Sequence, residues 1–197
     1  MKSVTHNNRG IEAEVDCMFP DRWSPRSFRS DPLEDYQLQA LFEAARWAPS
    51  CFNEQPWLFV YARTEEDRKR LIPILSEKNR LWAPGAPILM FLIARRKFGA
   101  SEKENRHAAF DAGAAWMSLA LQARKLGLYA HAMAGFNQDM AYEVLNLSRE
   151  KFLVMAAIAV GRRKSPADLP DELMMAERPN ERKPLSEVAV ELNSERI

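Results

Sequence analysis

The sequence predicts a single domain of the α+β class, in which one β-sheet is flanked by helices. Four apolar runs have the length of strands: 57–62, 88–93, 129–133 and 152–160. Between them, apolar residues recur with the helical period. The run 88–93 is apolar at every position and is therefore expected to be a central strand. With 197 residues, of which 47% are hydrophobic, the chain can bury one core of ordinary size.

The first predicted helix has signals at both ends. Asp31 is a candidate N-cap, Pro32 suits the first helical position, and Glu34 completes the spacing of a capping box. The helix must end before Pro49, because a residue that precedes proline is disfavoured in the α region. The apolar stripe between these ends consists of Leu38, Leu41, Phe42 and Ala45.

Three further helices are expected. Thr64 suits the N-cap of a helix that kinks near Pro73, and Asn137 suits the N-cap of a helix that runs through Leu145. The segment 107–126 predicts a long helix that is apolar on nearly every side and stops at Gly127. Such a helix needs two partners, and we expect these to be its own sheet and a second subunit.

Charge and residue content argue against several kinds of partner. The 28 basic and 27 acidic residues give a net charge of +1, which favours neither a nucleic acid nor an anionic membrane surface. Cys17 and Cys51 form no disulfide framework, and the histidines at 6, 107 and 131 are too scattered for a metal-ligand pattern. We therefore expect no metal site and a reducing compartment.

The chain also lacks the signals of export and membrane insertion. Residues 1–9 are polar and contain no secretory h-region, and the longest apolar stretch, Ala112 to Ala123, is too short to span a bilayer. These features predict a cytoplasmic protein with no membrane partner.

Two polar segments are unlike core sequence and suggest a binding site. Arg22, Ser24 and Arg26 occupy alternate positions, so in an extended segment all three point the same way, as a phosphate site requires. The loop between Pro49 and Pro56 carries hydroxyl and amide side chains between a helical pattern and a strand.

These segments belong to six short motifs that occur in order between Arg22 and Val188. They are Arg22-x-Ser24-x-Arg26-x-Phe28, Ala48-Pro49-Ser50-x-x-Asn53-x-Gln55-Pro56-Trp57, Asn79-x-x-Trp82-Ala83-x-x-Ala86-Pro87, Asp111-x-Gly113-x-Ala115, Ala134-Gly135-Phe136 and Arg182-Lys183-Pro184-Leu185. Together they resemble the signatures of the nitroreductase family, flavoproteins that bind FMN at a homodimer interface. The resemblance implies a mostly antiparallel sheet flanked by helices, a homodimer and an extended C-terminal tail. It places one FMN-binding domain at 20–197, preceded by an arm of uncertain structure at 1–19.

The resemblance also implies roles for residues of one subunit. Arg22 and Ser24 would contact the ribityl phosphate and the polar flavin edge, and Arg26 would lie near N1 and O2, where negative charge develops on reduction. Asn79 would hydrogen-bond the pyrimidine edge. The backbone at Ala134 and Gly135 would approach N5, and Arg182, with Lys183 as its nearest substitute, would bind the phosphate.

Other residues would reach the flavin from the second subunit, and these are Pro49, Ser50, Cys51 and Asn53. Cys51 stands where many relatives carry serine, so a hydroxyl contact is in doubt there and a backbone contact is expected. Ala134 stands where some relatives carry an acidic residue, which leaves a less polar wall beside N5. Without a neighbouring histidine in sequence, Cys51 is expected to be a packing residue and not a nucleophile.

The implied function is FMN-dependent, NAD(P)H-driven reduction of nitroaromatics, quinones or similar electron-poor acceptors. Because the chain has no GxGxxG motif after a strand, the nicotinamide is expected to use the flavin pocket and to leave before the acceptor enters, in a ping-pong cycle. Two alternatives stay open. The fold can serve dehalogenation, enoyl reduction or flavin breakdown, for which Ser101 to Arg106 is a candidate lid, or the protein can bind FMN without turnover.

Overall fold

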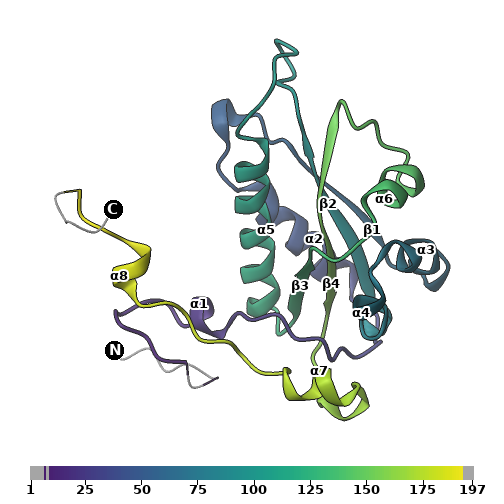
Figure 1. Ribbon diagram of the computed structural model, residues 1–197, viewed down its shortest axis with the longest axis vertical. Helices are drawn as coiled ribbons and strands as arrows, with labels where there is room; N and C mark the ends of the chain where they lie inside the picture. Colours follow the sequence, from purple (N-terminus) through teal and green to yellow (C-terminus); the bar gives the residue numbers. More distant parts are fainter. Residues whose placement is uncertain (1–6, 8, 193–197) are drawn as a thin grey trace.

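A four-stranded sheet lies between two layers of helices in the computed structural model (Figure 1). The structure describes residue 7 and residues 9–192, so His6 and the first part of the predicted arm lie outside the described residues. Helices α2 (Asp35–Arg46) and α5 (Ala108–Lys125) cover one face of the sheet. Helices α3 (Glu65–Leu71), α4 (Glu77–Arg80) and α6 (Gln138–Val144) lie on the other side.

The sheet confirms the predicted strands and the antiparallel arrangement. Its strands are β1 (Trp57–Ala62), β2 (Ile88–Arg95), β3 (Tyr129–Met133) and β4 (Phe152–Gly161), in the order β1-β2-β4-β3. Each neighbouring pair is antiparallel. The two central strands are β2 and β4. Since side chains alternate between the faces of a strand, Met90 and Leu92 enter the core under α5, whereas Leu89 and Phe91 enter the core under α3 and α6.

Helix α5 confirms the long apolar helix and its stop at Gly127. Its inner face is rich in alanine, which allows close packing against the sheet, whereas Phe110 on the outer face is 81% exposed. Gly127 has a positive φ of 72°. The amide of Leu128 donates to the carbonyl of Ala123 at 2.8 Å, and the amide of Gly127 to that of Arg124 at 3.0 Å, which is a Schellman C-cap.

The start of α2 corrects one prediction. The N-cap is Glu34 and not Asp31, because a capping box forms between the side chains and backbone amides of Glu34 and Gln37. The Asp31 carboxylate instead pairs with Arg29 at 2.6 Å. The caps at Thr64 and Asn137 are confirmed, since each side chain accepts a hydrogen bond from a backbone amide three residues on. Near Pro73 the chain passes from α3 into a 3₁₀ turn over Ile72–Ile74.

The two ends of the described chain lie along the same side of the sheet. A short helix, α1 (Met18–Asp21), precedes the segment 27–29, which pairs with 162–164: Arg29 donates its amide to Arg162 at 2.8 Å, and Lys164 to Ser27 at 3.1 Å. The tail then forms α7 (Asp171–Met175) and α8 (Leu185–Val188). It is therefore partly helical, and α8 stands away from the sheet (Figure 1).

None of the helices in the described part of the chain is long and apolar enough to cross a membrane.

Replacing Gly127 by alanine is expected to destabilise the protein by about 1 to 2 kcal/mol, because an L-residue at this positive φ brings Cβ against its own backbone. The free energy of unfolding in urea measures the effect. Gly10→Ala is the matched control, since nothing lies within 4 Å of a Cβ there, and should change it by less than about 0.5 kcal/mol. Equal effects at the two positions would contradict the role assigned to the C-cap.

Candidate functional site

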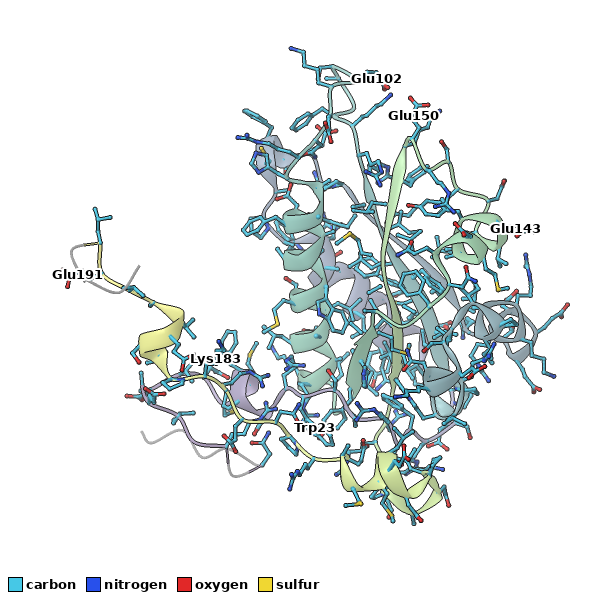
Figure 2. All side chains as sticks on the ribbon, in the orientation of Figure 1. Trp23, Glu102, Glu143, Glu150, Lys183 and Glu191 are labelled. Atoms are coloured by element: carbon cyan, nitrogen blue, oxygen red, sulfur yellow. The ribbon has the colours of Figure 1, made fainter. Side chains whose placement is uncertain are left out.

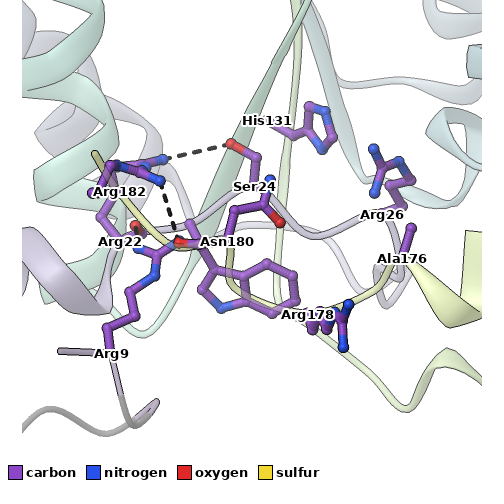
Figure 3. Close-up of a pocket in the computed structure, with 10 residues that line it drawn as sticks. Arg9, Arg22, Ser24, Arg26, His131, Ala176, Arg178, Asn180 and Arg182 are labelled. Atoms are coloured by element: carbon purple, nitrogen blue, oxygen red, sulfur yellow. Dashed lines mark hydrogen bonds between the residues drawn. The ribbon is translucent and has the colours of Figure 1, made fainter. Parts of the chain in front are cut away.

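Five arginines line one cavity of about 280 Å³ at the end of the sheet where β3 begins and β4 ends. We call it the arginine cavity. Among the described residues its wall contains no carboxylate. Figure 3 shows the ten residues that line it: Arg9, Arg22, Trp23, Ser24, Arg26, His131, Ala176, Arg178, Asn180 and Arg182. A cavity with this wall suits a ligand that carries negative charge.

The segment 21–27 supplies three of these side chains, as the alternating pattern predicts. Trp23, Pro25 and Ser27 are buried, whereas Arg22, Ser24 and Arg26 are half-buried and line the cavity. Side chains at alternate positions of an extended segment point the same way, so burial of one set presents the other to the cavity.

Buried polar groups hold this segment in place from two directions. The Glu177 carboxylate, which is 6% exposed, accepts the backbone amides of Arg26 and Ser27, each at 2.9 Å. On the opposite side, Nδ1 of His131 lies 2.8 Å from the Pro25 carbonyl. Since only a protonated Nδ1 can donate to a carbonyl, this contact selects that tautomer. The backbone between the arginines is thereby fixed by both the tail and strand β3.

The arginines form two groups on opposite sides of the cavity (Figure 3). Arg9, Arg22 and Arg182 make one group, and Arg26 and Arg178 make the other. Burial, followed by the charges of Arg182 and Arg9, lowers the pKa of Arg22. Burial and the charge of Arg182 likewise lower the pKa of Arg9. These cations repel one another, so an anion placed among them would relieve the repulsion.

His131 is a half-buried base in the wall of the cavity. Its ring centroid lies 4.5 Å from that of Trp82. Burial lowers its pKa to about 4; the hydrogen bond to the Pro25 carbonyl opposes this change, and the charges of Arg26 and Arg22 lower the pKa further. The ring is therefore neutral at physiological pH. The structure therefore makes His131 a hydrogen-bonded histidine of strand β3 that also lines the cavity.

Three predicted residues lie together just beyond β3. Asn79 Nδ2 donates to the Gly135 carbonyl at 2.9 Å, and the amide of Ser76 donates to the same oxygen at 2.9 Å. A Cβ at position 135 would lie 2.7 Å from the Ser76 hydroxyl oxygen and 2.9 Å from Asn79 Nδ2, so this approach requires glycine. Ala134 precedes it directly. Asn79 is linked to the arginine cavity through Trp82, which stacks on His131.

The loop that contains Pro49, Ser50, Cys51 and Asn53 lies elsewhere. The Cys51 amide donates to the Asp111 carboxylate at 3.1 Å, in the first turn of α5. The Cys51 carbonyl accepts the amide of Glu54 at 3.1 Å. Both backbone groups of Cys51 are thus engaged within its own chain.

This loop is strained and exposes an aromatic ring. Phe52, Asn53 and Gln55 all have positive φ, at 52°, 59° and 50°, and the Phe52 side chain is 89% exposed. Left-handed conformations are costly for residues other than glycine and concentrate at functional sites. Residues just before the candidate lid contact this loop: Gly99 donates its amide to the Glu54 carboxylate at 2.5 Å, and the Phe98 and Phe52 ring centroids are 6.1 Å apart.

Helix α5 separates the two sets of predicted residues. The loop is hydrogen-bonded to Asp111, which lies near the beginning of α5. Near the end of α5, Arg124 Cζ lies 4.0 Å from the centroid of the Tyr129 ring. The Tyr129 ring in turn packs edge-on against Trp23, with the two ring centroids 6.0 Å apart. The 13 residue steps from 111 to 124 span about 20 Å of helix. Figure 2 shows Glu102, shortly before α5, and Trp23 at opposite ends of the molecule. One chain therefore does not bring the loop to its own arginine cavity.

Sequence reasoning missed several residues of the cavity. Arg9 lies in the predicted arm, and only its contacts reveal it: its Nη1 donates to the carbonyls of Pro20 and Arg22, both at 2.9 Å. Arg178 and Asn180 lie in a charged tail, where no pattern distinguishes them. Of the two tail cations, Arg182 lines the cavity, whereas Lys183 pairs with Glu187 at 3.2 Å.

The fold and the motifs define a member of one flavoprotein family. The model of the nitroreductase family matches residues 20–83 and 74–162 of this chain. The chain therefore belongs to the nitroreductase family.

Comparisons with individual proteins agree with this family membership. A Streptomyces coelicolor protein described as a candidate NADH dehydrogenase/NAD(P)H nitroreductase is 31% identical over 147 residues, which are 64% of this chain and 73% of the relative. A solved structure described as an oxidoreductase containing FMN is 42% identical, with a TM-score of 0.91 over 96% of this chain and 98% of its own. A candidate nitroreductase from Exiguobacterium sibiricum, solved with FMN, shares the fold at 19% identity, with a TM-score of 0.74 over 92% of this chain and 99% of its own.

Acid is expected to destabilise the protein through His131. Its pKa is about 4 in the folded state, against about 6.5 in an unfolded chain, so the unfolded state binds the extra proton between these values. The contribution of the neutral His131 to the free energy of unfolding is fully present above about pH 6.5 and is lost as the pH drops toward 4. At pH 5 the loss should be about 1 to 2 kcal/mol relative to pH 7.5, measured by urea unfolding.

The control for this prediction is His131→Asn, whose amide can still donate to the Pro25 carbonyl but does not titrate. The other histidines are the same in both proteins, so their contribution cancels. An equal loss of stability in the variant and in the wild type would show that His131 is not the source.

Proposed function

We propose that this protein is an FMN-dependent oxidoreductase that uses NADH or NADPH to reduce nitroaromatics, quinones or similar electron-poor acceptors. Membership of the nitroreductase family and the 42% identity to an FMN-containing oxidoreductase support the class of activity. The observation that carries the proposal is the arginine cavity. It is assembled from residues that the family motifs predict to bind FMN, together with Arg9 and Arg178 from the ends of the chain.

The cavity fits the phosphate end of FMN. A phosphate monoester carries a charge of about −1.5 to −2 at neutral pH and three acceptor oxygens. Arg9, Arg22 and Arg182 offer planar sets of N–H donors on one side of the cavity, with the Ser24 hydroxyl nearby. Burial, followed by repulsion from Arg182 and Arg9, lowers the pKa of Arg22, and the bound dianion would offset the repulsion. These residues are therefore the proposed phosphate ligands.

The other side of the cavity suits the flavin ring. We assign Arg26 to the N1 and O2 edge, where a cation stabilises the negative charge that reduction creates. Asn79 would meet the pyrimidine edge through its amide, and Ala134 and Gly135 would leave the N5 edge accessible. The contact between Asn79 and the Gly135 carbonyl holds these two groups in one arrangement.

The flavin site is proposed to be completed by a second copy of the chain. The strained loop with Pro49, Ser50, Cys51 and Asn53 lies about 20 Å of helix away from the arginine cavity of its own chain. A two-fold axis would bring the loop of each subunit to the cavity of its partner. The exposed Phe110 on α5 offers an apolar surface for such an interface. The Cys51 carbonyl accepts one hydrogen bond and keeps a second lone pair, so we retain a backbone contact between Cys51 and the cofactor as part of the proposal.

Bound FMN would supply a hydride acceptor and donor at N5. The protein would position the flavin, compensate its charge and exclude water, and no side chain is assigned as a covalent catalyst. Nicotinamide and acceptor would occupy the same pocket in turn. Both cysteines are free thiols in the structure, which fits the reducing cytoplasmic environment that we propose.

Purified protein is expected to carry FMN, or to take it up, and to show the absorbance of a bound flavin. Anaerobic addition of NADH or NADPH should bleach that absorbance, and a quinone or nitroaromatic acceptor should restore it. Steady-state oxidation of the nicotinamide should then require the acceptor. Protein that binds no FMN contradicts the proposal, and flavin that no nicotinamide reduces supports the non-catalytic alternative.

Arg182→Ala should weaken FMN binding by about 10- to 100-fold, which corresponds to the loss of a charge-assisted hydrogen bond. Titration of flavin-free protein with FMN measures the change. Lys183→Ala is the matched control, because this neighbouring cation pairs with Glu187 outside the cavity and should bind FMN normally. If the control weakens binding as much as Arg182→Ala does, the cavity has been assigned to the wrong tail residue.

A shared site predicts complementation between two defective chains. Arg22→Glu should destroy the phosphate site, and Ser50→Trp should block the site that the loop enters. When the two chains are produced together in equal amounts, half the dimers are mixed and one of their two sites is intact. About a quarter of the wild-type FMN content should therefore return. Absence of recovery in mixed dimers, verified by differently tagged chains, would rule out a loop contributed by the partner.

A further inference from the structure

A second cavity adjoins the arginine cavity on the side of Arg9, Arg22 and Arg182. We call it the arm groove, because residues between positions 9 and 20 form one of its walls. Its volume is about 250 Å³, close to the 280 Å³ of the arginine cavity. Arg9 and Arg182 line both cavities. A phosphate bound by these two arginines would consequently lie at the boundary between them.

The arm groove differs from the arginine cavity in chemistry. Ile11, Val15 and Phe19 line it with 40%, 38% and 45% of their surfaces exposed, and the ring of Pro20 lies beside them. Glu181 faces them from the tail. The groove thus has an apolar wall, one carboxylate, and the two arginines that it shares with the arginine cavity. Such a groove suits an aromatic group that is attached to a phosphate.

We propose that the arm groove accepts the adenosine end of flavin adenine dinucleotide, so that the two cavities together hold FAD as well as FMN. The inference rests on the proposed function, because it requires the FMN phosphate to lie at Arg9 and Arg182. FAD is FMN whose phosphate is extended through a diphosphate to adenosine. The additional half of the molecule therefore begins at the boundary where the arm groove begins.

The groups of the groove match adenosine. The rings of Phe19 and Pro20 provide surfaces on which a purine can stack. The Glu181 carboxylate can accept a hydrogen bond from the exocyclic amine of adenine or from a ribose hydroxyl. The diphosphate of FAD carries about as much charge as the FMN phosphate, so the three arginines compensate either ligand equally well.

The same groove is a poor place for the adenosine of a nicotinamide dinucleotide that binds after FMN. The FMN phosphate would already occupy the boundary at Arg9 and Arg182. A second diphosphate brought to the same arginines would be repelled by it. We therefore assign the groove to the flavin and not to the electron donor.

Isothermal titration calorimetry of flavin-free protein with FMN and with FAD tests the assignment through the ratio of the two dissociation constants, FAD over FMN. In wild-type protein the ratio should be below ten. Phe19→Ala should raise it about tenfold by removing the stacking surface, with FMN affinity unchanged. Tyr61→Ala is the matched control, since Tyr61 is also 45% exposed but lies on β1, and should leave the ratio as it is.

A second variant guards against an effect of Phe19 on helix α1. Val15→Asp lies before that helix and adds a negative charge to the groove, so it should also raise the ratio. A wild-type ratio above ten, or a ratio that both variants change by less than threefold, overturns the inference while leaving FMN binding and the proposed function intact. If neither flavin binds to the wild type, the proposed function fails, and the inference fails with it.

Discussion

Mutual repulsion of arginines is the constraint on which the functional end of this protein depends. Five guanidinium groups line a single cavity, and for Arg22 and Arg9 the neighbouring cations add to burial in lowering the pKa. Such an arrangement persists only if the backbone that carries the arginines is held firmly. Repulsion among the arginines lowers the stability of the folded protein, and a bound anion would offset that cost.

Much of the restraint comes from polar groups that bind the backbone. Arg9 donates to the carbonyls of Pro20 and Arg22, Glu177 accepts the amides of Arg26 and Ser27, and His131 binds the Pro25 carbonyl. Each contact fixes the main chain and leaves the cavity wall positive. The N-terminal arm, the C-terminal tail and strand β3 thus converge on one segment. Three of the five arginines come from the arm and the tail, so the sheet and its helices alone would form only part of the cavity.

Helix α5 provides the second constraint, which is distance. It carries the strained loop at its beginning and ends near the arginine cavity, so a rigid rod separates two groups of residues that the family motifs assign to one cofactor. A helix does not shorten to bring its ends together. The separation within the chain therefore supports a shared site between two copies, with the exposed outer face of α5 available for contact.

The sequence alone establishes the strands, most helix ends and the family, because these depend on local patterns. The run 57–62 has the predicted bounds of its strand, Thr64 and Asn137 cap their helices, and the alternation of Arg22, Ser24 and Arg26 already indicates which side chains share a face. The start of α2 was misplaced because Asp31 and Glu34 are both acceptable caps, and only the reciprocal bonds with Gln37 distinguish them.

Arg9, Arg178 and the hydrogen bond of His131 were beyond sequence reasoning. Their roles depend on tertiary contacts, which for His131 and Pro25 join residues 106 positions apart. The position of the loop relative to the cavity depends on the length and direction of α5. Local propensity reports how a segment folds, whereas the charge, burial and neighbours of a side chain are set only when distant segments pack together.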